Sequence, residues 1–232
     1  MKKFILAMAA LTFSFGVMSA QDLASATATY NSGAEALTMG NKTSALEYFQ
    51  KALTMAESLG EEGAEVATNC KNAIPSVILS IGKEFYNNKD FSNAKAKFVE
   101  AAEVAKKYGN EEVTAEVESL LPTVGKRIAL AKVNEAMKNK DIAGVLAGYE
   151  EAMAIDTTDA NTALKYGQFL GNAGKYDDAV KYLELAARHG QEGNAKSVLS
   201  TTFLKNAAAQ LKAGKYADAV KLAETAISYK EN

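Results

Sequence analysis

Very few side chains in this sequence could act as a nucleophile, a general base or a metal ligand. The chain has one histidine, His189, and one cysteine, Cys70. A single histidine excludes sites built on two histidines, and Arg188-His189-Gly190 is typical of a helix C-terminus, where positive side chains and a left-handed glycine are favoured. Cys70 could be a reactive or cross-linking thiol, but a small buried hydrophobe on a helix is the more common role. We therefore expect no catalytic residue, no cofactor and no metal.

Two further patterns resemble chemical motifs but have simpler interpretations. Asn172-Ala173-Gly174-Lys175 lacks the first glycine of a phosphate-binding loop, because position 169 is Phe, and Tyr176 stands where Ser or Thr is needed. The acidic pairs Glu61-Glu62 and Glu111-Glu112 each follow a glycine-containing segment. They are typical of the first turn of a helix, whose dipole favours negative charge. Neither pattern predicts catalysis.

The elements around these residues form an internal repeat. Ala173–Lys181 and Ala213–Lys221 both read Ala-Gly-Lys-Tyr-x-Asp-Ala-Val-Lys and start 40 residues apart. A repeat of this length indicates one supersecondary unit stacked several times, each copy completing the hydrophobic face of its neighbour. Such an architecture favours a binding scaffold over an enzyme.

The hydrophobic pattern predicts that every repeat is helical. Apolar residues recur three and four positions apart, as in Leu46, Phe49 and Leu53. No segment alternates apolar and polar residues between hairpin turns, so no sheet is expected. Short turns between antiparallel helices are predicted at Gly40-Asn41, Lys89-Asp90, Lys140-Asp141, Gly174-Lys175 and Gly214-Lys215. The chain is predicted to be all-α.

Residues 160–193 resemble the tetratricopeptide repeat (TPR), a helix pair of 34 residues. Small Gly167, Ala179 and Ala186 stand where the two helices cross, and Tyr166 and Leu183 flank them. Further copies are predicted at 26–59, 75–108, 126–159 and 200–232. The resemblance implies a right-handed superhelical array of antiparallel helix pairs.

The predicted repeats depart from the family pattern in two ways. The copy at 126–159 has Val133 and Val145 at two positions that are small in the family. The first two spacings between repeats are longer than 34 residues, and the extra residues precede Pro75 and Pro122. A proline inside a helix removes one backbone hydrogen bond. The sequence therefore predicts long first helices in the second and third repeats, or else separate short helices joined at the prolines.

The resemblance implies that the first helix of each repeat lines a concave groove for a peptide or a partner helix. Amide side chains suit hydrogen bonds to a peptide backbone, and cationic ones suit carboxylates. The groove positions carried over from the family are Tyr30, Lys83, Tyr86, Asn87, Arg127, Asn134, Lys138, Asn161, Gln168, Asn172 and Lys212.

The N-terminus has the pattern of an export signal. Lys2 and Lys3 precede an uncharged, largely apolar run from Phe4 to Val17, which is shorter than a membrane-spanning helix needs. We expect residues 1–20 to be cleaved and residues 21–232 to form a single repeat domain that does not span a membrane. The expected location is the periplasm, including the periphery of the outer membrane.

Charge and composition limit the partners. Without the two lysines of the predicted signal, 24 Lys and Arg stand against 28 Asp and Glu, a net charge of −4. This balance argues against nucleic acid, which requires a basic surface. We expect a non-catalytic scaffold that binds a protein or peptide of the cell envelope. The alternative is a protein that binds a glycan or serves an envelope polymer, although most aromatic residues fall at predicted core positions: Phe49, Phe85, Phe98, Tyr149, Tyr166, Tyr176 and Tyr216.

The last predicted helix has more apolar residues than one packed side needs. Its apolar residues are Val220, Leu222, Ala223, Ala226, Ile227 and Tyr229. Repeat arrays require polar or capped ends, so apolar surface at this edge favours a contact with another molecule. We therefore expect this C-terminal edge, and Ile227 and Tyr229 in particular, to mediate a homodimer or a partner contact.

Overall fold

The computed structural model describes residues 19–231, and all regular structure within them is helical. Residues 1–18, which hold most of the predicted signal peptide, and Asn232 lie outside the described residues. The α-helices are α1 (Ser19–Thr38), α2 (Lys42–Ser58), α3 (Ala64–Asn87), α4 (Phe91–Tyr108), α5 (Glu111–Lys138), α6 (Ile142–Ile155), α7 (Ala160–Asn172), α8 (Tyr176–Ala186), α9 (Glu192–Lys212) and α10 (Tyr216–Glu231). A 3-10 turn (Gly60–Gly63) precedes α3, and a π turn (Ala187–Gln191) precedes α9.

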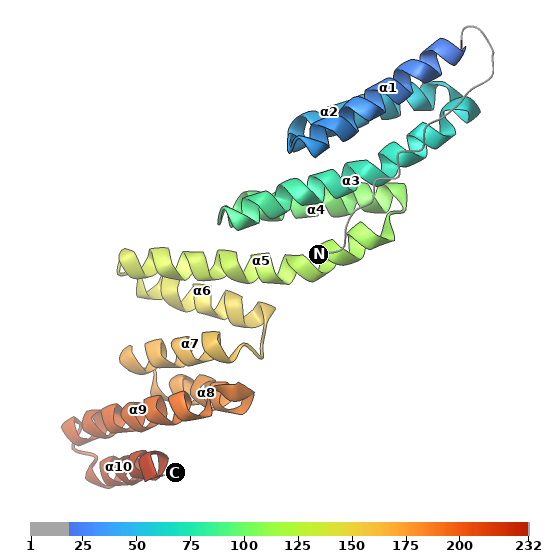
Figure 1. Cartoon of the computed structure of the whole chain (residues 1–232). Helices are drawn as coiled ribbons and strands as arrows, with labels where there is room; N and C mark the ends of the chain where they lie inside the picture. Colours follow the sequence, from blue (N-terminus) through green and yellow to red (C-terminus); the bar gives the residue numbers. More distant parts are fainter. Residues whose placement is uncertain (1–18, 232) are drawn as a thin grey trace. The chain divides into compact units, whose positions relative to one another are not determined.

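Consecutive helices form antiparallel pairs, from α1 with α2 through to α9 with α10 (Figure 1). The prediction of an all-α chain of antiparallel helix pairs is confirmed. The pairs belong to two compact units, one up to Leu121 and one from Pro122, so that the boundary lies inside α5. We refer to them as the N-terminal unit and the C-terminal unit.

Both prolines lie inside long helices. Pro75 is buried within the 24 residues of α3, and Pro122 lies within the 28 residues of α5. The prediction of long first helices is therefore confirmed, and the alternative of separate short helices is wrong. The added N-terminal part of α3 packs against α2: the Lys71 Nζ lies 2.9 Å from a Glu57 carboxylate oxygen. The extra residues thus lengthen the contact between the first and second repeats.

The turns inside the five repeats share one conformation. In each, a residue in the left-handed region ends the first helix: Gly40, Lys89, Lys140, Gly174 or Gly214. The amide of the next residue then donates to a carbonyl five residues back, as Asn41 does to Ala36 over 2.8 Å. This bond and the left-handed residue define the Schellman motif, which satisfies carbonyls at the helix end.

Two of these turns use lysine where glycine would fit without strain. Lys89 has φ 62° and Lys140 has φ 56°. We expect Lys89→Gly to raise the free energy of unfolding by about 0.5–1 kcal/mol, because a side chain in the left-handed region meets the following carbonyl oxygen. Lys95→Gly, at an exposed position within α4, is the control and should instead lower stability by about 1 kcal/mol. Urea denaturation of both variants measures the difference, and equal destabilisation would contradict the prediction.

Glycine lets the two helices of a repeat approach closely. A Cβ atom at Gly33 would lie 2.8 Å from the Phe49 ring, and one at Gly82 would lie 2.6 Å from the Phe98 ring. In the third repeat the first helix has Val133 instead of glycine, and the glycine at the crossing is Gly148 on α6, whose Cβ would lie 2.6 Å from Val133 Cγ2 on α5. Glycine on the opposite helix therefore accommodates the valine that departs from the family pattern.

Aromatic residues fill the core of the C-terminal unit. The Tyr166 ring lies 5.1 Å from Tyr149 and 4.5 Å from Tyr182, measured between centroids, and its hydroxyl donates to Glu150 over 3.1 Å. Burial, followed by this hydrogen bond, raises the pKa of Tyr166. One core prediction is wrong: Tyr216 is 67% exposed, because no described helix covers its side of α10.

Cys70 is fully buried in α3. Burial, and secondarily the nearby charge of Glu57, raises the pKa of its thiol to about 12. A thiol that stays protonated and inaccessible is a poor nucleophile. The interpretation of Cys70 as a small core hydrophobe is confirmed.

Candidate peptide-binding face

The exposed side of α7 is a continuous polar stripe. Asn161, Lys165, Gln168 and Asn172 recur three and four residues apart, so they lie on one side of the helix. All four are exposed, while the opposite side is buried against α8 and α6. A helix with one buried and one polar side presents the polar side to solvent or to a ligand.

The neighbouring first helix, α9, continues this polar surface. The Lys205 Nζ donates to the Asn172 Oδ1 over 2.5 Å, which joins the C-terminal end of the α7 stripe to α9. Gln191, just before α9, donates through Nε2 to the Asn161 Oδ1 over 2.8 Å. The two bonds hold the exposed sides of α7 and α9 next to each other.

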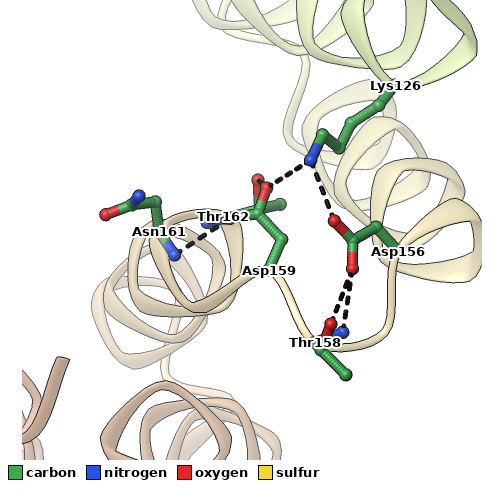
Figure 2. Close-up of polar contacts among 6 residues, drawn as sticks. All are labelled: Lys126, Asp156, Thr158, Asp159, Asn161 and Thr162. Atoms are coloured by element: carbon green, nitrogen blue, oxygen red, sulfur yellow. Dashed lines mark hydrogen bonds and ion pairs between the residues drawn. The ribbon is translucent and has the colours of Figure 1, made fainter. Parts of the chain in front are cut away.

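An ion-paired lysine joins α5 to the start of α7. The Lys126 Nζ lies 3.0 Å from an Asp156 carboxylate oxygen and 3.1 Å from one of Asp159 (Figure 2). Asp159 also caps α7, because its carboxylate accepts from the amides of Asn161 and Thr162. Next to Lys126 on α5, Arg127 begins an exposed stripe that continues with Asn134 and Lys138. The C-terminal unit therefore presents one polar face, formed by Arg127, Asn134, Lys138, Asn161, Lys165, Gln168, Asn172, Thr201, Lys205 and Lys212.

The ion pair shifts the ionisation of its members. A hydrogen bond from Lys126, and further bonds from Thr158, hold the pKa of Asp156 below its usual value. Burial opposes ionisation of Asp159, but bonds from Thr162 and Lys126 outweigh it, so its pKa is also lowered. The hydrogen bond to Asp156 is the largest influence on Lys126 and raises its pKa. The cluster is therefore charged at neutral pH.

This cluster predicts acid-sensitive stability. Carboxylates with lowered pKa values stabilise the fold above their unfolded pKa, near 4, and lose that effect as pH falls through the folded pKa. We expect Lys126→Met to lower the free energy of unfolding by about 1 kcal/mol at pH 7, with the difference from the wild type shrinking towards pH 2. Denaturant titrations at a series of pH values measure this.

Lys132→Met provides the matched control. Lys132 pairs with Glu151 at 2.7 Å, but both side chains are more exposed than those of the Lys126 cluster. An exposed pair contributes little, so we expect a change below about 0.5 kcal/mol. Equal effects of the two substitutions, or a Lys126→Met effect that persists at pH 2, would contradict the prediction.

The predicted groove residues of the N-terminal unit have close internal contacts. The Tyr30 ring lies 5.2 Å from Phe49, and burial raises the pKa of Tyr30; Tyr86 lies 5.4 Å from Phe91. The Lys83 Nζ lies 2.6 Å from Glu116 on α5. Asn87 is exposed at the end of α3. Tyr30, Lys83 and Tyr86 are therefore half-buried in internal contacts.

Sequence reasoning missed Lys165, Lys205 and Glu116. Lys165 could have been found, because it stands four residues after Asn161 and three before Gln168. The pairings of Lys205 with Asn172 and of Glu116 with Lys83 join residues 33 positions apart, and repeat positions alone do not reveal such contacts.

Comparisons with known proteins agree with the repeat assignment. A family model described as tetratricopeptide repeat matches residues 26–59, so the prediction that this is a TPR protein is confirmed. The other four repeats are assigned by their helix pairs. No significant match to a curated protein was found.

Several solved structures match most of this chain at low sequence identity and low TM-score. MamA is 16% identical over 86% of this chain and 94% of its own, with a TM-score of 0.30. YrrB, described as a TPR protein with an unusual peptide-binding site, is 15% identical over 93% of each chain, with a TM-score of 0.29. PilF of Pseudomonas aeruginosa is 16% identical over 87% of this chain and 90% of its own, with a TM-score of 0.33. At these values the similarity assigns no function.

No helix among residues 19–231 has the length and hydropathy that crossing a membrane requires. Within the same residues, no group of three or more His, Cys, Asp or Glu side chains is placed to hold a metal ion.

Proposed function

We propose that this protein is a non-catalytic periplasmic scaffold that binds a protein or peptide through the polar face of its C-terminal unit. The observation that carries the proposal is the charge of that face. Its exposed charged residues that form no ion pair with another described residue are Arg127, Lys138, Lys165, Lys205 and Lys212. The exposed acidic residues on α7, α9 and the part of α5 from Pro122 onward are Glu135 and Glu192, and Glu192 is paired with Lys196.

This charge distribution favours an acidic ligand. The described N-terminal unit neutralises its groove lysine, Lys83, with Glu116, whereas the C-terminal face keeps its cations accessible. Lysine and arginine bind carboxylates, and the interleaved amides of Asn134 and Gln168 can donate to and accept from a peptide backbone. We therefore propose an extended peptide segment rich in Asp and Glu, or ending in a free carboxylate, from a partner in the cell envelope.

Charge reversal tests this proposal. We expect an Arg127→Glu, Lys138→Glu, Lys165→Glu variant to lose more than about tenfold in affinity for acidic peptides, measured by fluorescence anisotropy. Wild-type binding should also weaken as salt is raised, because exposed charges are screened. The control reverses Lys51, Lys95 and Lys221, which are exposed on second helices, and so changes the net charge equally. Equal binding by both variants would refute the site.

Capture from an envelope extract tests the class of ligand. Recovery of a protein that the charge-reversed variant fails to recover would support the peptide site. Retention on insoluble glycan, with no protein partner, would instead support the glycan alternative. Several aromatic residues that a sugar platform would need, including Phe49, Phe98, Tyr149 and Tyr166, are buried, which favours the peptide.

Self-association through the C-terminal edge is a separate part of the proposal. Ile227 is 53% exposed, in agreement with the prediction for this edge. For Tyr229 the prediction is wrong in part. The Tyr229 ring stacks on Phe203, with centroids 5.6 Å apart, and is half-buried because it faces α9.

A further inference from the structure

Five large apolar side chains are exposed at the C-terminal edge. Leu204 (51%) and Leu211 (55%) lie on α9, and Tyr216 (67%), Val220 (57%) and Ile227 (53%) lie on α10. The three on α10 recur four and seven residues apart, so they form one stripe. Contiguous apolar surface of this kind usually marks an interaction site.

The preceding repeat shows what covers such a surface. The residues 40 positions earlier, Leu164, Gly171, Tyr176, Val180 and Ala187, are all buried or half-buried. Helix α9 packs against both α7 and α8, and a Cβ at Gly171 would lie 2.9 Å from the Thr202 hydroxyl of α9. The edge is therefore the fifth repeat's copy of a surface that, in the fourth repeat, the next first helix covers.

The surface of the fifth repeat differs from that of the fourth at the positions that contact the covering helix. Leu211 stands where the fourth repeat has Gly171, so a helix covering the edge must be smaller than α9 at the position of Thr202. Lys212 stands where the fourth repeat has Asn172, the acceptor for Lys205. The covering helix must therefore supply an acceptor at the position of Lys205, because a lysine there would face Lys212.

Helix α1 meets both requirements. Aligning the first repeat (26–59) with the fifth (200–232) places Ala28 at the position of Thr202 and Asn31 at that of Lys205. Alanine leaves room for Leu211, and the Asn31 side-chain oxygen can accept from Lys212. Ala28 and Asn31 are both exposed on the described α1, so nothing in residues 19–231 covers them.

We propose that the C-terminal edge binds α1 of a second copy of this chain, so that the copies associate head to tail. The inference rests on the proposed self-association of the edge, which shares Lys212 with the peptide-binding face. It replaces a symmetric edge-to-edge homodimer by a contact between two different surfaces. We call α1 the head and the C-terminal edge the tail. Such a contact leaves the head of one copy and the tail of the other free, so further copies can add as the concentration rises.

Two variants with different defects test the proposal. Ala28→Arg blocks the head, and the double variant Leu211→Asp, Ile227→Asp blocks the tail; all three positions are exposed, so the fold should be retained. By light scattering after size exclusion, the weight-average mass of the wild type should at least double as concentration rises, and each variant alone should stay monomeric. Mixing the two variants should restore a 1:1 dimer that grows no further, because the mixture holds one intact head and one intact tail.

The outcomes are distinguishable. A wild type that stays monomeric would refute both the edge self-association and the inference. A wild-type dimer that survives Ala28→Arg would support the symmetric homodimer and overturn the inference. As a second readout, mixed Ala28→Cys and Leu211→Cys chains should form an intermolecular disulfide, whereas Lys51→Cys with Leu211→Cys should not. Circular dichroism of each variant shows whether it has folded.

Discussion

Gly167→Val is expected to destabilise the C-terminal unit by about 3 kcal/mol. A Cβ at Gly167 would lie 2.6 Å from Leu183 Cγ and 3.1 Å from the Ala179 carbonyl oxygen. Contacts under 3 Å force the two helices apart, and valine adds two methyl groups beyond that Cβ. Leu183 and Ala179 are fully buried, so no rearrangement into solvent relieves the clash. The helices α7 and α8 would separate, and the aromatic cluster around Tyr166 would lose its packing.

Gly193→Val provides the matched control for this substitution. Gly193 lies in the first turn of α9, and a Cβ there meets no atom within 4 Å. The same replacement should therefore change the free energy of unfolding by less than about 0.5 kcal/mol. Guanidinium denaturation followed by circular dichroism measures both variants. Similar stability of the two variants would show that the repeat tolerates a side chain at the helix crossing.

The architecture was predictable because it depends on local signals that recur. The turn residues, the small residues at the crossings and the apolar spacing each repeat with the helix pair, so one well-matched copy identifies the others. The long helices through Pro75 and Pro122 were predicted as one of two alternatives. Tertiary packing decided between them: the added part of α3 has α2 to pack against, as the ion pair of Lys71 with Glu57 illustrates.

Contacts between repeats were less predictable than the repeats themselves. Lys126 joins α5 to Asp156 and Asp159 in the loop before α7, and no local pattern indicates this pair. Tyr216 was assigned to the core because its counterpart Tyr176 belongs there, but a position in a repeat is buried only when a neighbour covers it. An identical repeat sequence therefore predicts the local structure, whereas the exposure of each residue depends on whether a neighbouring helix packs over it.

The repeat pattern predicted which residues of the first helices are exposed, and their role in ligand binding stays a prediction. Arg127, Asn134, Gln168 and Asn172 lie on one polar face because the family pattern fixes which side of each first helix is free. The pattern does not show which cations are neutralised by another repeat. Lys83 forms an ion pair with Glu116, whereas Lys165 is exposed. The accessible positive charge therefore lies on the C-terminal unit.

The close approach of Gly148 to Val133 in the third repeat predicts strong coupling between these two positions. Val133 Cγ2 would lie 2.6 Å from a Cβ at Gly148, and the Ala129 carbonyl oxygen would lie 3.2 Å away. Val133 is buried and β-branched, so it cannot turn aside easily. We expect Gly148→Ala alone to destabilise by about 2 kcal/mol through overpacking, and Val133→Ala alone to destabilise by about 2 kcal/mol through the cavity that it leaves.

The double variant distinguishes direct contact from independent effects. With Val133→Ala in place, the new methyl group at position 148 occupies the space that the valine vacated. The double variant should therefore be more stable than the sum of the single effects predicts, by about 1–2 kcal/mol, which is the range for residues in contact. Urea denaturation of the four chains gives this interaction energy. A value near zero would mean that Gly148 is small for another reason, and that Val133 fits this repeat without it.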